Sequence, residues 1–262
     1  MHLVELEDLA WFPAILRDGG TTYLELALRL SGHGAMLAPR VAQALTDTGE
    51  RHVVDLCSGG GGPAAIVAAE LHKQGMPVTV RLSDLYPNLP ALQRQAAESG
   101  GALSVEPRPV DATAVPADVK GFRTIFNAFH HFPPELARRV LQNAVDARQP
   151  IGVFEVVSRE PLMLLGMLTA PIGVMLTLPL WRPFRWAWIF WTWIIPVMPA
   201  FVLWDGLVSW LRIYSEDELR ELVSGIDAPN WIWEIGKTKL GDAPAYATWL
   251  VGRPVAAAGV AT

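Results

Sequence analysis

The residues of this chain that are best suited to chemistry surround a run of glycines. Residues 53–64 read VVDLCSGGGGPA, so four consecutive glycines follow an apolar run that contains one acid and the only cysteine. Glycine has no side chain and adopts backbone angles that other residues avoid, which allows a ligand to approach the backbone closely. A strand that ends in such a turn and opens a helix presents backbone amides and the helix N-terminus to that ligand. The stretch therefore predicts a ligand-binding loop.

The spacing of this loop also satisfies a dinucleotide fingerprint. Residues 59–64 fit G-x-G-x-x-[G/A], and Asp84 follows about 20 residues later, where the fingerprint has an acid. Other nucleotide signatures fail, because the tetrad Y-x-x-x-K of short-chain dehydrogenases occurs at none of the four tyrosines. The sequence GKT at 236–238 resembles the end of a phosphate-binding loop, but Trp231 stands where the first glycine should be. An NAD(P)-dependent oxidoreductase stays open as one alternative.

A second group of reactive side chains follows a later apolar run. His130 and His131 lie beyond a predicted strand, on the ligand side of an open α/β sheet. Histidine titrates near neutrality, so either residue could act as a general base, or could instead bond the backbone at the strand end. Adjacent histidines rarely converge on one ion, so we expect no metal site. Glu155, in the next strand, could reach the acceptor pocket, but we expect it instead to pair with Arg159 at the strand end.

Alternating strands and helices must position these groups. β-branched and apolar runs predict strands at 51–57, 77–82, 103–106, 123–126, 151–157, 230–238 and 245–253. Helical spacing, helix-forming composition and capping signals predict helices at 22–30, 35–47, 64–74, 89–98, 133–147 and 215–225. The last two strands have no helix between them and should pair antiparallel. We therefore expect an α/β fold: a Rossmann-like, seven-stranded, mostly parallel sheet with a C-terminal antiparallel hairpin and a hydrophobic helical insertion after the fifth strand.

These motifs together resemble the class I S-adenosylmethionine (SAM)-dependent methyltransferases. The spacing D-x-C-x-G-x-G that starts at Asp55 is similar to the first motif of that family, [D/E]-x-G-x-G-x-G, with Cys57 in place of a glycine. Asp84 matches the acid that ends the second strand, and Asp111 matches the acid after the third. The stretch TIFNAFHHF is similar to the fourth motif. The resemblance covers most of the chain outside the insertion.

The resemblance implies SAM as cofactor and methyl transfer as activity. SAM carries its methyl group on a sulfonium, so the loop would approach a cation instead of a phosphate. In the family, the acid at position 84 holds the ribose hydroxyls and the acid at 111 lies near the adenine, while Asp55 would fix the loop or accept from the SAM amino group. The expected cofactor-binding residues are Asp55, Cys57, Gly59, Gly61, Asp84, Leu85, Asp111, Ala112 and Asn127. The expected catalytic residues are His130 and His131, and the expected substrate contacts are Tyr23, Phe129 and Trp204.

Residues 161–204 form an apolar segment in which Arg182 and Arg185 are the charged groups. Residues 162–181 and 186–204 are each long enough to cross a bilayer core of about 30 Å as a helix. Six prolines, at 161, 171, 179, 183, 196 and 199, should interrupt such helices. We therefore expect shallow or re-entrant membrane contact through 162–204, with a hydrophobic lid or a homo-oligomer interface as the alternative. An apolar wall beside the donor predicts a hydrophobic small-molecule or lipid-like acceptor.

Composition narrows the remaining function classes. A formal charge of -5 provides no basic field for nucleic acid. A single cysteine excludes an intrachain disulfide and fits a reducing compartment, and the acidic N-terminus has no secretory pattern. We expect a cytoplasmic protein associated with the cytoplasmic side of a membrane; a membrane-anchored, non-catalytic SAM-binding protein is another alternative. The expected divisions are a helical cap at 1–48, a SAM-binding core at 49–160, the insertion at 161–210, the rest of the core at 211–254 and a loose tail at 255–262.

Overall fold

A seven-stranded sheet lies at the centre of the computed structural model, which describes residues 3–242 and 245–255. The strand order is β3-β2-β1-β4-β5-β7-β6. The strands are β1 (His52–Asp55), β2 (Thr79–Leu82), β3 (Leu103–Val105), β4 (Phe122–Phe126), β5 (Ile151–Glu155), β6 (Trp231–Lys239) and β7 (Tyr246–Pro254). The first five pair in parallel, and β7 runs antiparallel to both β5 and β6. The expected fold class is confirmed. The predicted loose tail lies outside the described residues from 256 onward.

The strand order indicates where on the sheet a ligand would bind. The chain moves outward from β1 through β2 to β3 and then returns to β4 on the other side of β1. Open α/β sheets bind ligands beyond the carboxyl ends of their strands at such a switch point. The glycine run and the two histidines follow β1 and β4, so both lie at this edge of the sheet.

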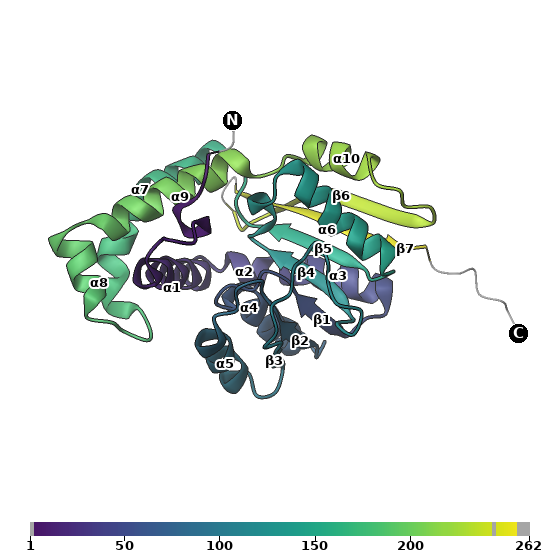
Figure 1. Cartoon of the computed structure of the whole chain (residues 1–262), viewed down its shortest axis with the longest axis horizontal. Coiled ribbons are helices and arrows are strands. Elements are labelled where there is room, and N and C mark those ends of the chain that lie inside the picture. The colour runs from purple at the N-terminus through teal and green to yellow at the C-terminus, as the bar shows by residue number, and fades with distance from the viewer. Residues whose placement is uncertain (1–2, 243–244, 256–262) are drawn as a thin grey trace, which may run out of the picture.

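Helices cover both faces of the sheet (Figure 1). The core on one face includes side chains of α3 (Ala38–Thr48), α4 (Gly62–Lys73) and α5 (Leu89–Glu98). The core on the other face includes side chains of α6 (Pro134–Asp146) and α10 (Glu216–Ser224). The predicted capping box of α10 is present: Ser215 accepts from the Glu218 backbone amide, and the Glu218 carboxylate accepts from that of Ser215.

The first long helix differs from its prediction. α1 (Ala14–Ser31) begins eight residues before the predicted start at 22 and contains Gly19 and Gly20 in its interior. These glycines weaken the helical signal, but a neighbouring helix needs the space that they leave. A Cβ atom on Gly20 would lie 2.7 Å from the ring of Phe201. Gly32, at a φ of 68°, ends the helix, and the short α2 (His33–Met36) follows.

The apolar segment folds as a helical arm. Its elements are α7 (Pro161–Thr177), η3 (Leu178–Leu180), α8 (Ala187–Ile189), the π-helical η4 (Phe190–Ile194) and α9 (Val197–Arg212). Figure 1 shows α7 and α9 packed side by side, with α8 at the far end of the arm and α1 beneath it. The prediction that each proline interrupts a helix is wrong at Pro171, which lies inside α7, and at Pro199, which lies in the first turn of α9. An interior proline costs a helix stability, but α7 packs along α9, and this packing stabilises it. Pro196 does mark a break, because the helices on either side bend by 78°.

The arm and the N-terminal residues share one apolar cluster. Phe12 and Leu16 pack with Trp181, Trp188 and Phe201, apart from the two cores on the sheet. The indole nitrogen of Trp188 donates to the carbonyl of Ile15 at 2.8 Å. The N-terminal cap and the insertion therefore fold against each other. They bring the short helix η1 (Leu6–Asp8) toward η2 (Phe129–His131), which follows β4.

Candidate functional site

The glycine loop joins β1 to α4 in a left-handed conformation at several positions. Cys57, Gly59 and Gly61 have φ angles of 59°, 53° and 80°. Cys57 occupies the position of a glycine in the resembling motif, and its positive φ explains why glycine suits that position. A Cβ on Gly60 would meet Thr21 of α1 at 2.9 Å, whereas around Gly59 nothing lies within 4 Å. The backbone at Gly59 is therefore open to a ligand.

Asp55 holds the loop from beneath. One carboxylate oxygen accepts from the hydroxyl of Thr124 at 2.8 Å, and the other accepts from the hydroxyl of Ser58 at 2.7 Å. Burial raises the pKa of Asp55 to about 7, although the two hydroxyl donors act in the opposite direction and the charge of Asp84 adds to the rise. Of the two roles that the sequence left open for Asp55, the structure supports fixing the loop.

Asp84 and Asp111 follow neighbouring strands at the same edge. One oxygen of Asp84 accepts from the backbone amide of Gly59 at 2.9 Å, and the other accepts from the amide of Tyr86. Asp111 is exposed and accepts from the amide and the hydroxyl of Thr113, both at 2.8 Å. Asp84 thus contacts the glycine loop, and its expected role at the ribose stays a prediction.

The remaining predicted cofactor residues have mixed environments. Burial, followed by the charges of the acids at 84, 55 and 111, raises the pKa of the Cys57 thiol, which favours its neutral form. Leu85 is exposed, whereas Ala112 is buried in the core. Asn127, at a φ of 51°, accepts from the amide of Val156 through its side chain, which ties the end of β4 to β5.

His130 and His131 each donate to a carboxylate through Nδ1. For His130 the partner is Glu155 at 3.0 Å, and for His131 it is Asp8 at 2.9 Å. Glu155 also accepts from the backbone amides of Phe129 and His130. The predicted pairing of Glu155 with Arg159 is therefore wrong. Arg159 pairs with Glu218 instead, because Glu155 turns toward η2.

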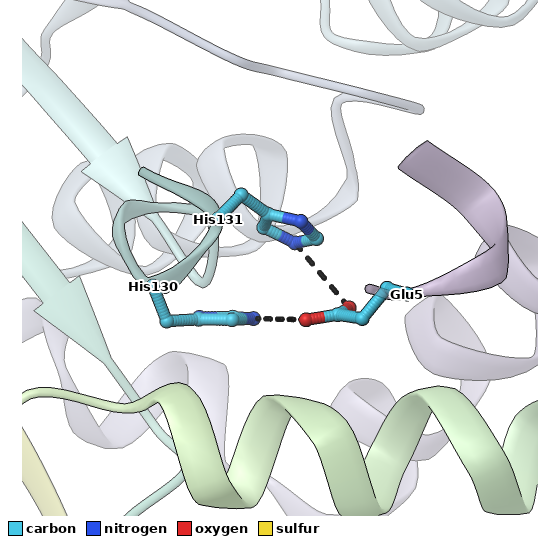
Figure 2. A group of neighbouring side chains, drawn as sticks. All are labelled: Glu5, His130 and His131. Atoms are coloured by element: carbon cyan, nitrogen blue, oxygen red, sulfur yellow. Dashed lines mark ion pairs between the residues drawn. The ribbon is translucent and has the colours of Figure 1, made fainter. Parts of the chain in front are cut away.

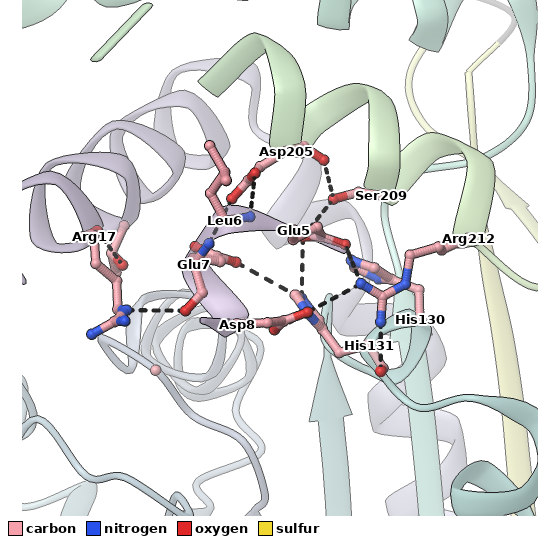
Figure 3. A network of polar contacts seen from close by, with 12 residues as sticks. Glu5, Leu6, Glu7, Asp8, Arg17, His130, His131, Asp205, Ser209 and Arg212 are labelled. Carbon is pink, nitrogen blue, oxygen red and sulfur yellow. Dashed lines mark hydrogen bonds and ion pairs between the residues drawn. The ribbon is translucent and has the colours of Figure 1, made fainter. Parts of the chain in front are cut away.

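Residues near the N-terminus complete this group, and they form the part of the site that the sequence did not reveal. Figure 3 shows Glu5, Glu7 and Asp8 beside the two histidines, held by residues of α9. Arg212 donates to Glu5, to Asp8 and to the carbonyl of His131. The acidic run LVELED is the only local signal, and it names no partner.

The charges of this group bear on the expected general base. Burial opposes the charged form of His131, but the hydrogen bond to Asp8 and the charges of Glu5, Asp8 and Glu7 outweigh it and raise the pKa to about 9. At neutral pH the imidazole of His131 is then protonated, so the prediction of a resting general base at this residue is not supported. Burial also raises the pKa of Glu7, and raises that of Asp205 to about 7.

The predicted substrate residues do not come together. Phe129 is 1% exposed and packs against Phe132 and Tyr214, so its assignment as a substrate contact is wrong: it belongs to the core. Tyr23 faces Trp181 of the arm. Trp204 lines an apolar groove.

Two cavities flank these groups. The apolar groove has a volume of about 540 Å³, and its lining includes Leu6, Phe12, Phe201 and Trp204. A more polar cavity of about 610 Å³ reaches the glycine loop at Gly60, between α1, α5 and the loop at 182–185.

Comparison with known proteins places this fold. No protein-family model matches the sequence, and a search of curated proteins finds no relative. The mitomycin 7-O-methyltransferase MmcR superposes with a TM-score of 0.51 at 17% identity, covering 86% of this chain and 53% of that one. The plantazolicin methyltransferase BpumL, in complex with a monoazolic desmethylPZN analog and SAH, gives 0.53 at 10% identity, covering 90% of each chain. This chain thus spans about half the length of the mitomycin enzyme. It has the fold of the class I SAM-dependent methyltransferases.

Proposed function

We propose that this chain binds SAM at residues 57–61 and transfers its methyl group to a hydrophobic small-molecule acceptor at a membrane surface. The observation that carries the proposal is the contact between Asp84 and the amide of Gly59, beside open backbone. This contact links Asp84, which follows β2, to the glycine loop, which follows β1. Both lie at the switch point of the sheet, where open α/β sheets bind ligands.

The charge at this edge favours SAM over a dinucleotide. Three acids, Asp55, Asp84 and Asp111, lie close enough to Cys57 to act on its thiol. Carboxylates repel the pyrophosphate of NAD(P) and attract the sulfonium and ammonium groups of SAM. SAM supplies an activated methyl group when bound. Asp84 and Asp111 would then serve the ribose and adenine ends, and the backbone at Gly59 would lie beside the methionine part.

The arm supports a hydrophobic acceptor and membrane contact. One face of α7 is exposed and apolar along its length, and it includes Leu162, Leu165, Leu168, Ile172, Met175 and Leu176. Residues 161–180 are long and apolar enough to cross a membrane, and only about 11% of this stretch is buried. Apolar patches of this kind mark membrane or protein contacts. Because the chain returns to the sheet on both sides of the arm, we propose that the arm rests in one leaflet on the cytoplasmic face.

Calorimetric titration with S-adenosylhomocysteine and with NADH tests the cofactor. We expect the first to bind and the second not to bind. Asp84→Ala should weaken binding at least tenfold, because it removes the acid that contacts the loop and would hold the ribose. Asp118→Ala, at an exposed acid paired with Arg108, serves as the matched control and should leave the affinity unchanged. Binding of NADH alone, or equal affinity in wild type and Asp84→Ala, would overturn the assignment.

A further inference from the structure

We infer that Glu5, His130 and His131 form a binding site for one divalent transition-metal ion of the Zn²⁺ type. The Nε2 atoms of the two histidines converge on the two oxygens of Glu5, at 3.8 and 3.7 Å (Figure 2). One ligand atom from each residue lies within 4.8 Å of the others. These separations are too long for hydrogen bonds but suit ligands arranged around an ion. Adjacent histidines rarely converge, but here both rings face one carboxylate.

The outer contacts of both imidazoles match those of metal ligands. Nδ1 of His130 faces a carboxylate oxygen of Glu155, and Nδ1 of His131 faces one of Asp8. A carboxylate only accepts, so each Nδ1 donates a proton to its carboxylate, and each Nε2 faces Glu5. An ion that binds here would displace the Nε2 proton of His131, as metal binding generally does at histidine. Metal-ligating histidines almost always have such a partner on the second nitrogen. The two carboxylates come from different elements, β5 and η1, and both histidines come from η2.

The two histidines differ in burial. The side chain of His130 is 4% exposed, and its Nε2 lies 3.8 Å from Glu5. His131 is 22% exposed, which leaves the site accessible from its side.

The surroundings also balance a positive ion. Glu5 accepts from Ser209 and Arg212, and ligating carboxylates usually carry such hydrogen bonds. Each carboxylate oxygen can accept these bonds and still ligate. Acids outnumber guanidinium groups here. Arg212 pairs with Glu5 and Asp8, and Arg17 donates to the carbonyls of Glu7 and Leu9 instead of to a carboxylate. The other acids of the group are Glu7, Glu155 and Asp205. Two histidines and one carboxylate are a donor set typical of transition metals with open positions, and nitrogen donors disfavour Mg²⁺.

The site is independent of the proposed methyl transfer, and its test uses the full-length protein after treatment with a chelator. Titration with Co²⁺ should produce visible absorption bands at one equivalent, and Zn²⁺ should displace the Co²⁺ while Mg²⁺ should not. Glu5→Gln and His131→Gln should each weaken binding at least tenfold. His72→Ala, at an exposed histidine of α4, is the control and should bind as wild type does.

Several results would overturn the site: no stoichiometric Co²⁺ binding, equal binding by both variants, or displacement by Mg²⁺. If Glu5→Gln fails to fold, the partly exposed His131→Gln decides. Binding of S-adenosylhomocysteine is measured on the same samples. A failed metal site with intact cofactor binding leaves the proposed function standing, and the reverse result leaves the metal site standing.

Discussion

At the scale of single residues, Asp55 is an ionisable group that is buried and that also holds the glycine loop through hydrogen bonds. It lies almost fully buried beneath the glycine loop, and its two oxygens each accept from a hydroxyl. Burial raises its pKa to about 7, from a usual value of 3.8. A carboxyl in this state holds the loop without placing a full charge in the core at mildly acidic pH.

This environment predicts a pH-dependent stability. Because the folded-state pKa lies above the unfolded value, the unfolded chain loses the proton first, so the contribution of Asp55 is largest near pH 4 and is lost as the pH rises to about 7. Relative to Asp55→Asn, the wild-type free energy of unfolding should fall over this range by up to about 4 kcal/mol, since one pKa unit corresponds to about 1.4 kcal/mol. Urea denaturation of both proteins from pH 4.5 to 8 measures the difference. A constant difference would contradict the raised pKa.

At the scale of elements, α1 shows how packing overrides helix propensity. Gly19 and Gly20 lower the helical tendency of the sequence, yet they allow α8 and α9 to approach. Tertiary contacts therefore stabilise a helix that begins before its local signal.

Two glycine-to-alanine substitutions distinguish the effect of tight helix packing on stability from the effect of helix propensity. Gly20→Ala should destabilise the protein by about 1–2 kcal/mol, because the new Cβ would press on the buried ring of Phe201 by more than the helical gain offsets. Gly166→Ala, on α7 where nothing lies within 4 Å, should stabilise by about 0.5–1 kcal/mol. Urea denaturation measures both. Equal stabilisation by the two variants would show that α1 and α9 do not approach closely.

At the scale of the whole molecule, the arm has one apolar side that packs against the rest of the protein and another that is exposed. Its inner side packs with the N-terminal residues around Trp181 and Trp188. Its outer side, along α7, stays exposed. The inner packing brings the acids at 5–8 to the histidines after β4, so the arm assembles the site as well as presenting an apolar face.

The outer face predicts binding to lipid. The combined variant Leu165→Gln, Leu168→Gln and Ile172→Gln should reduce co-sedimentation with phospholipid vesicles at least tenfold, because burial of one such side chain contributes about 1.5–3 kcal/mol. Leu30→Gln combined with Val255→Gln, at exposed apolar residues outside the arm, is the control. Both proteins should retain S-adenosylhomocysteine binding.

Two outcomes of this experiment would contradict membrane docking. One is unchanged co-sedimentation of the α7 variant. The other is a wild-type dimer, seen by light scattering, that the α7 variant converts to a monomer without any vesicle binding in either protein. The second outcome would assign the face to a homo-oligomer interface.

The sequence by itself determined the sheet and the glycine loop. Strand and helix patterns are local, and the motif from Asp55 to Asp84 combines a turn with the strand ends beside it. Tertiary structure decided what surrounds the histidines. Asp8 meets His131 across 123 residues, and Glu5 meets Arg212 across 207. Such contacts leave no periodicity or spacing in the chain, because they depend on how the arm packs against the N-terminal segment. The acidic run and the histidine pair are visible separately, and only the fold brings them together.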